Sequence, residues 1–98
     1  MGRYLSLWTI DWTKIPVDPK ERKIGFDMLM GMVKEDMKKG IIKDWGAYLG
    51  GYKGYSIMEG TEVEVLKEQQ QYTPFVNFEM HPIGTVPQVE EMLKALTK

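Results

Sequence analysis

The sequence contains no cysteine and only one histidine, His81, and each scarcity removes a class of chemistry. Without cysteine the protein has no disulfide bond, no thiolate nucleophile and no cysteine-ligated metal site. Charge of one sign is also lacking, because 13 basic residues are balanced by 14 acidic ones and the formal net charge is -1. Binding to nucleic acid requires clustered lysine and arginine, so we expect no nucleic-acid partner.

Long hydrophobic runs are missing too. The segment that begins at Arg3 lacks the apolar stretch of a signal peptide, and no run approaches the roughly 20 residues that span a bilayer. Together with the lack of cysteine, this predicts a soluble cytoplasmic protein without a membrane partner. What remains is a balanced composition, 43% hydrophobic and 28% charged over 98 residues, which predicts one domain covering residues 1–98.

Four segments alternate between two kinds of side chain in the way that β-strands do: 4–12, 41–49, 55–59 and 75–82. The last is the most regular and has one apolar face (Val76, Phe78, Met80) and one polar face (Asn77, Glu79, His81). In the second segment, strict alternation places Ile42 with Asp44 on one face and Trp45 on the other. The glycines at 50 and 51 predict a turn that joins the second and third segments into a hairpin.

Helix signals lie between these strands and after the last one. Asp18, followed by a proline and by Glu21, predicts a helix start at residue 19, and Gly40 after two lysines predicts its end. Capping-box patterns at Thr61 and Thr85 predict two further helices, one from residue 61 and one from residue 85 to the C-terminus.

The order β-α-β-β-α-β plus a terminal helix predicts an α+β protein with the ferredoxin-like arrangement, in which two helices cover one face of a four-stranded antiparallel sheet. The other face would carry an exposed apolar patch larger than a soluble monomer normally tolerates. A second copy packed sheet to sheet would cover it, so we expect a homodimer in which the terminal helix braces the partner.

Three segments, Tyr4–Ile10, Gly54–Gly60 and Pro74–Pro82, resemble the dimeric α/β-barrel superfamily. The resemblance is in particular to a small branch of proteins of unknown function related to muconolactone isomerase, YCII-like proteins and antibiotic-biosynthesis-monooxygenase-like proteins. It implies paired sheets that form a dimeric α/β barrel with a cavity in or beside it. It assigns no catalytic residue, since the superfamily hosts isomerases, cofactor-free monooxygenases, haem-degrading enzymes and ligand-binding modules.

His81 is the first candidate for chemistry, because an unperturbed histidine titrates near neutral pH and suits a general base. Glu79 projects from the same strand face and would orient the ring, while Asn77 would donate to a developing oxyanion. The alternative is structural, with His81 at the strand end beside Pro82 and Glu79 paired across the barrel. One histidine without an acidic cluster supplies too few ligands for a metal, so we expect no metal and no cofactor.

Aromatic residues form the second candidate site, as walls for a ligand with flat apolar groups. Its members are Trp8, Trp12, Trp45, Tyr48, Tyr52 and Tyr55. Trp8 and Trp12 would line a cavity with the polar face of residues 75–82 if they share that face, and a register shift of one residue would reverse this. The alternative is that these rings fill the core or the dimer interface.

These observations leave three hypotheses for function. The first is a homodimer that binds a small, partly aromatic molecule in a cavity between the sheet and the helices. The second is a cofactor-independent isomerase or monooxygenase with His81 as base, Glu79 as its orienting residue, and Trp8 and Trp12 holding the substrate. The third is a structural or regulatory dimer with a filled barrel.

Overall fold

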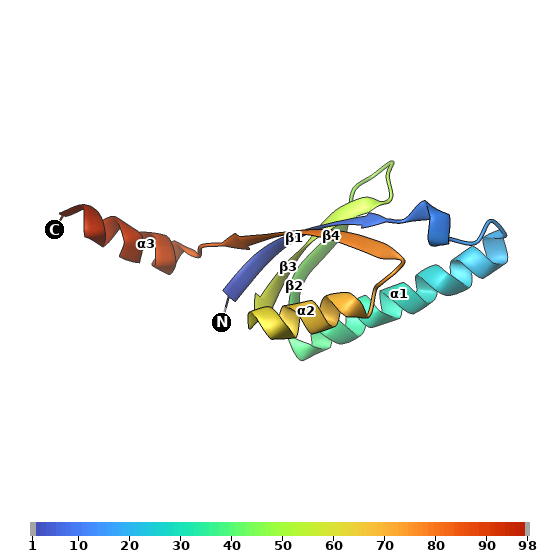
Figure 1. Cartoon of the computed structure of the whole chain (residues 1–98), viewed down its shortest axis with the longest axis horizontal. Helices are drawn as coiled ribbons and strands as arrows, with labels where there is room; N and C mark the ends of the chain where they lie inside the picture. Colours follow the sequence, from blue (N-terminus) through green and yellow to red (C-terminus); the bar gives the residue numbers. More distant parts are fainter. Residues whose placement is uncertain (1, 98) are drawn as a thin grey trace.

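The computed structural model describes residues 2–97 and has the predicted α+β architecture (Figure 1). The four strands form one antiparallel sheet in the order β2-β3-β1-β4, which is compatible with the ferredoxin-like fold. The strands are β1 (Gly2–Ile10), β2 (Ile42–Ala47), β3 (Lys53–Gly60) and β4 (Val76–Ile83). The helices are α1 (Pro19–Lys39), α2 (Glu62–Gln70) and α3 (Val86–Lys94), with short 3-10 turns η1 (Trp12–Lys14) and η2 (Ala95–Thr97).

The helix boundaries follow the predicted caps. The Asp18 side chain accepts a hydrogen bond from the Glu21 backbone N–H at the start of α1, and Gly40 ends that helix with φ 81°. Both capping boxes form, with Thr61 and Thr85 each accepting from the backbone N–H three residues later. These local bonds satisfy N–H groups that a helix start would leave unpaired, which is why the three helices begin where the sequence predicts.

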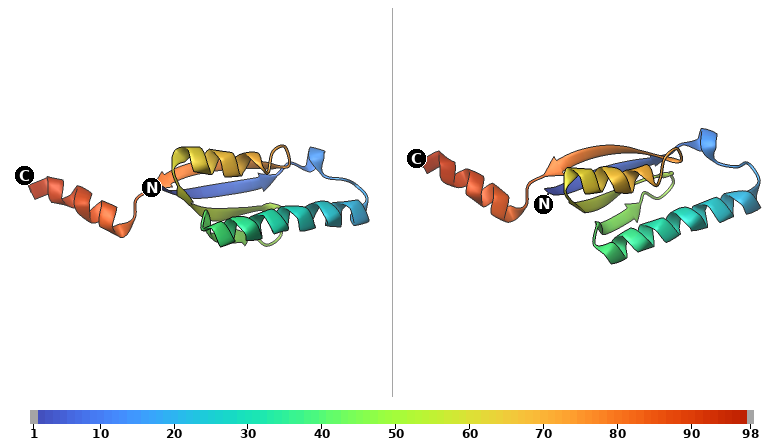
Figure 2. Two further views of the ribbon diagram at one scale, coloured as in Figure 1. Left: turned by 90° about the horizontal axis from the view of Figure 1, so that it is seen from below. Right: turned by 60° about the horizontal axis from the view of Figure 1, so that its bottom comes forward.

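Helices α1 and α2 lie on the same face of the sheet and leave the opposite face open, as expected (Figure 2). The core lies between this face and the helices, and the apolar face of β4 points into it. Its buried apolar members are Trp8, Leu29, Val33, Ile42, Met58, Val65, Tyr72 and Val76. The polar face of β4 points the other way, so the prediction of two chemically different faces is confirmed.

Strict alternation in β2 is wrong, because the pairing of β2 with β3 is interrupted by a bulge between Ile42 and Asp44. A bulge adds one residue to one strand and so reverses the face of everything that follows. Ile42 is therefore buried in the core, and Trp45 beyond the bulge also packs against the core. The sequence placed these two side chains on opposite faces.

The predicted first strand is too long at its C-terminal end. β1 stops at Ile10, and the Asp11 carboxylate accepts hydrogen bonds from the Thr13 backbone N–H at 3.0 Å and the Thr13 hydroxyl at 2.6 Å. These bonds begin the 3-10 turn η1, which carries Trp12 out of the strand. A short polar side chain that bonds to the backbone competes with strand pairing, and here it ends the strand.

Helix α3 projects away from the sheet and the other helices, and it lengthens the molecule to 62 × 26 × 18 Å (Figure 1). None of its residues is buried, although valine, methionine and leucine side chains recur at helical spacing along it. The chain thus leaves two surfaces without a partner, the open sheet face and α3. Among residues 2–97 no helix combines the length and the apolar character needed to cross a bilayer.

Met58 offers a test of the core. Its side chain is 2% exposed, and we expect Met58→Ala to lower the free energy of unfolding by about 2–5 kcal/mol through lost burial and a residual cavity. Urea denaturation measures the change. The matched control is Met28→Ala on α1, where the side chain is 55% exposed and we expect a change within about 0.5 kcal/mol. Equal effects of the two substitutions would contradict this core.

Candidate functional site

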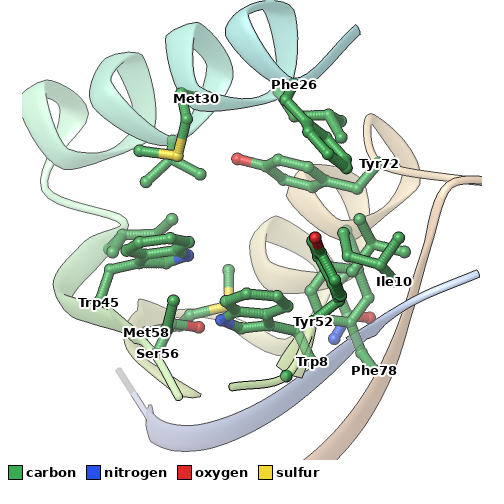
Figure 3. A pocket seen from close by; sticks show the side chains of 17 residues that line it. Trp8, Ile10, Phe26, Met30, Trp45, Tyr52, Ser56, Met58, Tyr72 and Phe78 are labelled. Carbon is green, nitrogen blue, oxygen red and sulfur yellow. The ribbon is translucent and has the colours of Figure 1, made fainter. Parts of the chain in front are cut away.

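A cavity of ≈ 270 Å³ lies between the sheet and helices α1 and α2 (Figure 3). Most of its lining is aromatic or aliphatic, and the few polar groups are hydroxyls and one amide. The aromatic members are Trp8, Phe26, Trp45, Tyr52, Tyr72 and Phe78. The polar members include Ser56 and Gln69. This combination of flat apolar walls and a few polar groups is typical of sites for small organic molecules.

Two tryptophans form the sheet side of the cavity. The rings of Trp8 and Trp45 stack with centroids 5.2 Å apart and planes inclined by 9°. Trp8 also donates from its indole N–H to the Tyr55 carbonyl at 3.2 Å. A Cβ atom at Gly54 would lie 2.4 Å from the Trp8 ring, so only glycine allows the ring to lie this close to β3.

Aromatic contacts also surround Tyr52, in the loop between β2 and β3. The Tyr52 ring meets the Trp12 ring edge to face at 4.0 Å and lies 6.2 Å from the Phe26 ring of α1. Its carbonyl accepts a hydrogen bond from the Ile10 backbone N–H at 2.9 Å, which fixes the loop to the end of β1. Tyr52 therefore connects the loop, η1 and α1 beside the cavity.

A buried carboxyl group lies behind the helix side of the cavity. The Tyr72 hydroxyl donates to the Asp36 carboxylate at 2.7 Å, and the Asp36 side chain is fully buried. Burial first, and then a hydrogen bond with Glu68, raise the pKa of Asp36 to about 6, against the opposing effect of the Tyr72 hydrogen bond. Burial and the Asp36 carboxylate also raise the pKa of Tyr72, so its phenol stays protonated.

Of the aromatic residues predicted to bind a ligand, some line the cavity and others do not. Trp8 and Trp45 line the cavity. Trp12 is 45% exposed and reaches the lining only through its contact with Tyr52. Tyr48 lies exposed beyond the end of β2 and is not among the lining residues.

The remaining predicted site residues lie on the open face of the sheet. His81 and Glu79 are both exposed there, with 2.7 Å between the histidine Nε2 and the carboxylate Oε2, and Asn77 follows on the same face. Tyr55 also lies there and donates its hydroxyl to Asp44 at 2.8 Å. Trp8 therefore does not share a face with His81. A catalytic role for His81 with Glu79 stays a prediction, and its site would be the open face rather than the cavity.

Sequence reasoning missed Asp36, Ser56, Gln69 and Tyr72. One signal was present for Asp36, because it follows Leu29 and Val33 at the spacing that keeps residues on one helix face, and these three are the buried residues of α1. An acid on an apolar face is a buried charge that needs a partner. Among residues 2–97 no three histidine or acidic side chains gather in a way that could hold a metal ion.

The pKa of Asp36 predicts a pH dependence of stability. The folded protein holds the proton of the Asp36 carboxyl group more tightly than the unfolded chain does. Protonation of Asp36 therefore stabilises the fold below about pH 4, and this stabilisation is lost as the pH rises through about 6. Asparagine cannot ionise, so Asp36→Asn does not lose this stabilisation at higher pH. We expect the free energy of unfolding of the variant, minus that of the natural protein, to be about 1–3 kcal/mol larger at pH 7.5 than at pH 4. Urea denaturation at the two pH values measures this.

The matched control is Asp27→Asn, which removes an exposed carboxylate from the same helix. We expect no comparable change with pH there. An Asp36→Asn protein whose stability follows the same pH curve as the natural one would contradict the raised pKa.

In comparisons with known proteins, no protein-family model matches this chain, and no curated protein matches it either.

Proposed function

We propose that this protein is a homodimer that binds a small, partly aromatic molecule in the cavity between the sheet and the helices. The cavity is the observation that carries the proposal. It has a volume of ≈ 270 Å³, close to the lower end of the roughly 300–1,000 Å³ of small-molecule sites. Apolar walls do not hold water well, and an unfilled apolar space forfeits the packing contacts that a ligand would supply.

The shape of the walls supports an aromatic ligand. Trp8 and Trp45 present nearly parallel rings on the sheet side, and Phe26 of α1 and Tyr72 after α2 lie opposite (Figure 3). Aromatic side chains favour stacked or edge-on contacts with other rings. A flat molecule between these walls would make both kinds of contact.

The open sheet face supports the homodimer. Cross-strand pairs of Leu5 with Ile57 and of Leu7 with Tyr55 form an apolar centre on this face. Polar side chains border it: Arg3 pairs with Glu59 at 2.5 Å, and His81 Nε2 lies 2.7 Å from the Glu79 carboxylate. An apolar centre with a polar rim is the usual anatomy of a protein–protein interface.

Helix α3 supports the same partner. Its apolar side chains Val89, Met92 and Leu93 are exposed in the single chain, as is Leu96 in the turn η2 that follows. A helix with one apolar stripe is stable when that stripe is packed against another surface. A second copy supplies such a surface while it covers the open sheet face, so one twofold assembly accounts for both unpartnered features.

Blocking the cavity tests ligand binding. Ala47 lines the cavity but is exposed, so Ala47→Trp adds bulk there without replacing a buried side chain. We expect native mass spectrometry to detect a small molecule on the natural protein and less of it on Ala47→Trp, with its chemical class given by denaturing extraction. The control Leu49→Trp changes a residue that is 102% exposed, and it should keep the molecule.

Equal retention by both tryptophan variants would place the molecule elsewhere and contradict the proposal. A natural protein that carries no molecule would favour the filled, structural dimer.

A charge on the open face tests the homodimer. Leu7 lies in the apolar patch opposite Glu79 of β4, and we expect Leu7→Glu to convert a dimer into a folded monomer because a second carboxylate would be buried beside the first. Sedimentation at low micromolar concentration measures the mass. Thr9→Glu, on the exposed end of the same strand, is the control and should remain dimeric. A natural protein that sediments as a well-folded monomer would contradict the proposal.

A further inference from the structure

One side chain that lines the cavity has an unpaired polar atom. Among residues 2–97, three buried side-chain atoms have no hydrogen-bond partner: Ser6 Oγ, Asp36 Oδ1 and Gln69 Nε2. Gln69 itself lines the cavity. Ser6 and Asp36 do not line it, and the Asp36 carboxyl already has Tyr72 and Glu68 as partners.

Leaving such atoms unpaired is costly, because each loses its hydrogen bonds to water and gains none in exchange. Native proteins therefore contain few of them. The unpaired Nε2 of Gln69 in the cavity wall indicates that the occupant has a polar group as well as an aromatic body.

The charges around the cavity indicate which kind of polar group a ligand would carry. None of the described lining residues carries a charge. The nearest carboxyl groups, Asp36 and Glu68, lie behind the Tyr72 hydroxyl and next to one another. Lys39, the cation at this position, is 3.9 Å from Glu68 and already offsets its charge. An anionic ligand would thus lose water without gaining a cation.

The position of Gln69 adds to this preference. It lies in the last turn of α2, at the negative end of the helix dipole. Its amide can both donate and accept, and its terminal torsion is soft, so the amide can turn toward a ligand at little cost. The polar group that it suits best is neutral and offers an acceptor oxygen to the unpaired Nε2.

Building on the proposed function, we infer that the cavity selects an uncharged aromatic molecule with an amide-like or other carbonyl group, which Gln69 binds through its side-chain amide, and that it rejects the carboxylate of the same shape. In this assignment Gln69 sets the specificity, and the aromatic walls supply affinity that is common to both ligands.

A set of three ligands tests the inference: indole, indole-3-carboxamide and indole-3-carboxylate. The carboxamide and the carboxylate have nearly the same shape and differ in charge. Binding to ¹⁵N-labelled protein, freed of any co-purified molecule, is followed by the indole N–H signals of Trp8 and Trp45, which line the cavity. We expect the carboxamide to bind at least about tenfold more tightly than the carboxylate.

Two variants assign the effect to one residue. Gln69→Met keeps the length of the side chain and removes the amide, and we expect about 3- to 10-fold weaker carboxamide binding with indole binding unchanged. Gln70→Met makes the same change at the exposed neighbouring position and should alter neither.

The outcomes separate this inference from the proposed function. Equal binding of carboxamide and carboxylate, or a carboxamide affinity that Gln69→Met leaves intact, would overturn the inference and leave a binding cavity in place. If none of the three ligands binds while native mass spectrometry finds a molecule on the natural protein, the inference again fails alone. If none binds and the natural protein carries no molecule, both fail.

Discussion

The close packing of the Trp8 indole on the backbone of β3 is the contact on which the cavity depends. It exists because Gly54 has no side chain, since a Cβ there would lie within 2.6 Å of two Trp8 ring atoms. With the ring held against the strand, Trp45 stacks on it, and the pair bounds the sheet side of the cavity. A Cβ at position 54 would also lie 2.1 Å from the Gly46 carbonyl oxygen, so a larger residue there would disturb the pairing of β2 with β3 as well as the position of the indole.

The opposite wall of the cavity depends on a polar contact between α1 and the turn that follows α2. The hydrogen bond from Tyr72 to Asp36 joins the segment after α2 to α1, although the two residues are 36 positions apart. Burying a carboxyl group is expensive, and a single hydroxyl compensates for only part of that cost. The contact is therefore costly to keep, and it holds the Tyr72 ring in place against α1.

Local signals in the sequence were sufficient for most of the fold. The caps at Asp18, Thr61 and Thr85 and the alternation of β4 each depend on neighbouring residues, and the structure confirms them. The bulge in β2 could not be read in this way, because it is a property of pairing with another strand rather than of β2 alone.

The candidate site was harder to predict than the fold. The polar residues at alternate positions of β4 predicted a site on what is the open face of the sheet. Trp8 was included among the ligand-binding residues, but the sequence did not decide which face it occupies. The cavity lies on the other face, where its lining comes from β1, β2, β3, β4, both covering helices and a loop. These elements meet at the cavity because of the spacing between the sheet and the helices. No single segment of the sequence determines that spacing. Asp36 was missed as well, although its spacing from Leu29 and Val33 on α1 was a local signal.

The edges of the sheet have a consequence for how far assembly can proceed. The outer strands are β2, which is short and bulged, and β4, which contains Pro82 and so lacks one backbone donor. Short strands, bulges and prolines all discourage another chain from adding to an edge. Lateral growth into continuous sheets or fibrils is thereby disfavoured, and the chain can present a broad apolar face at high concentration with less risk that the sheet extends without limit.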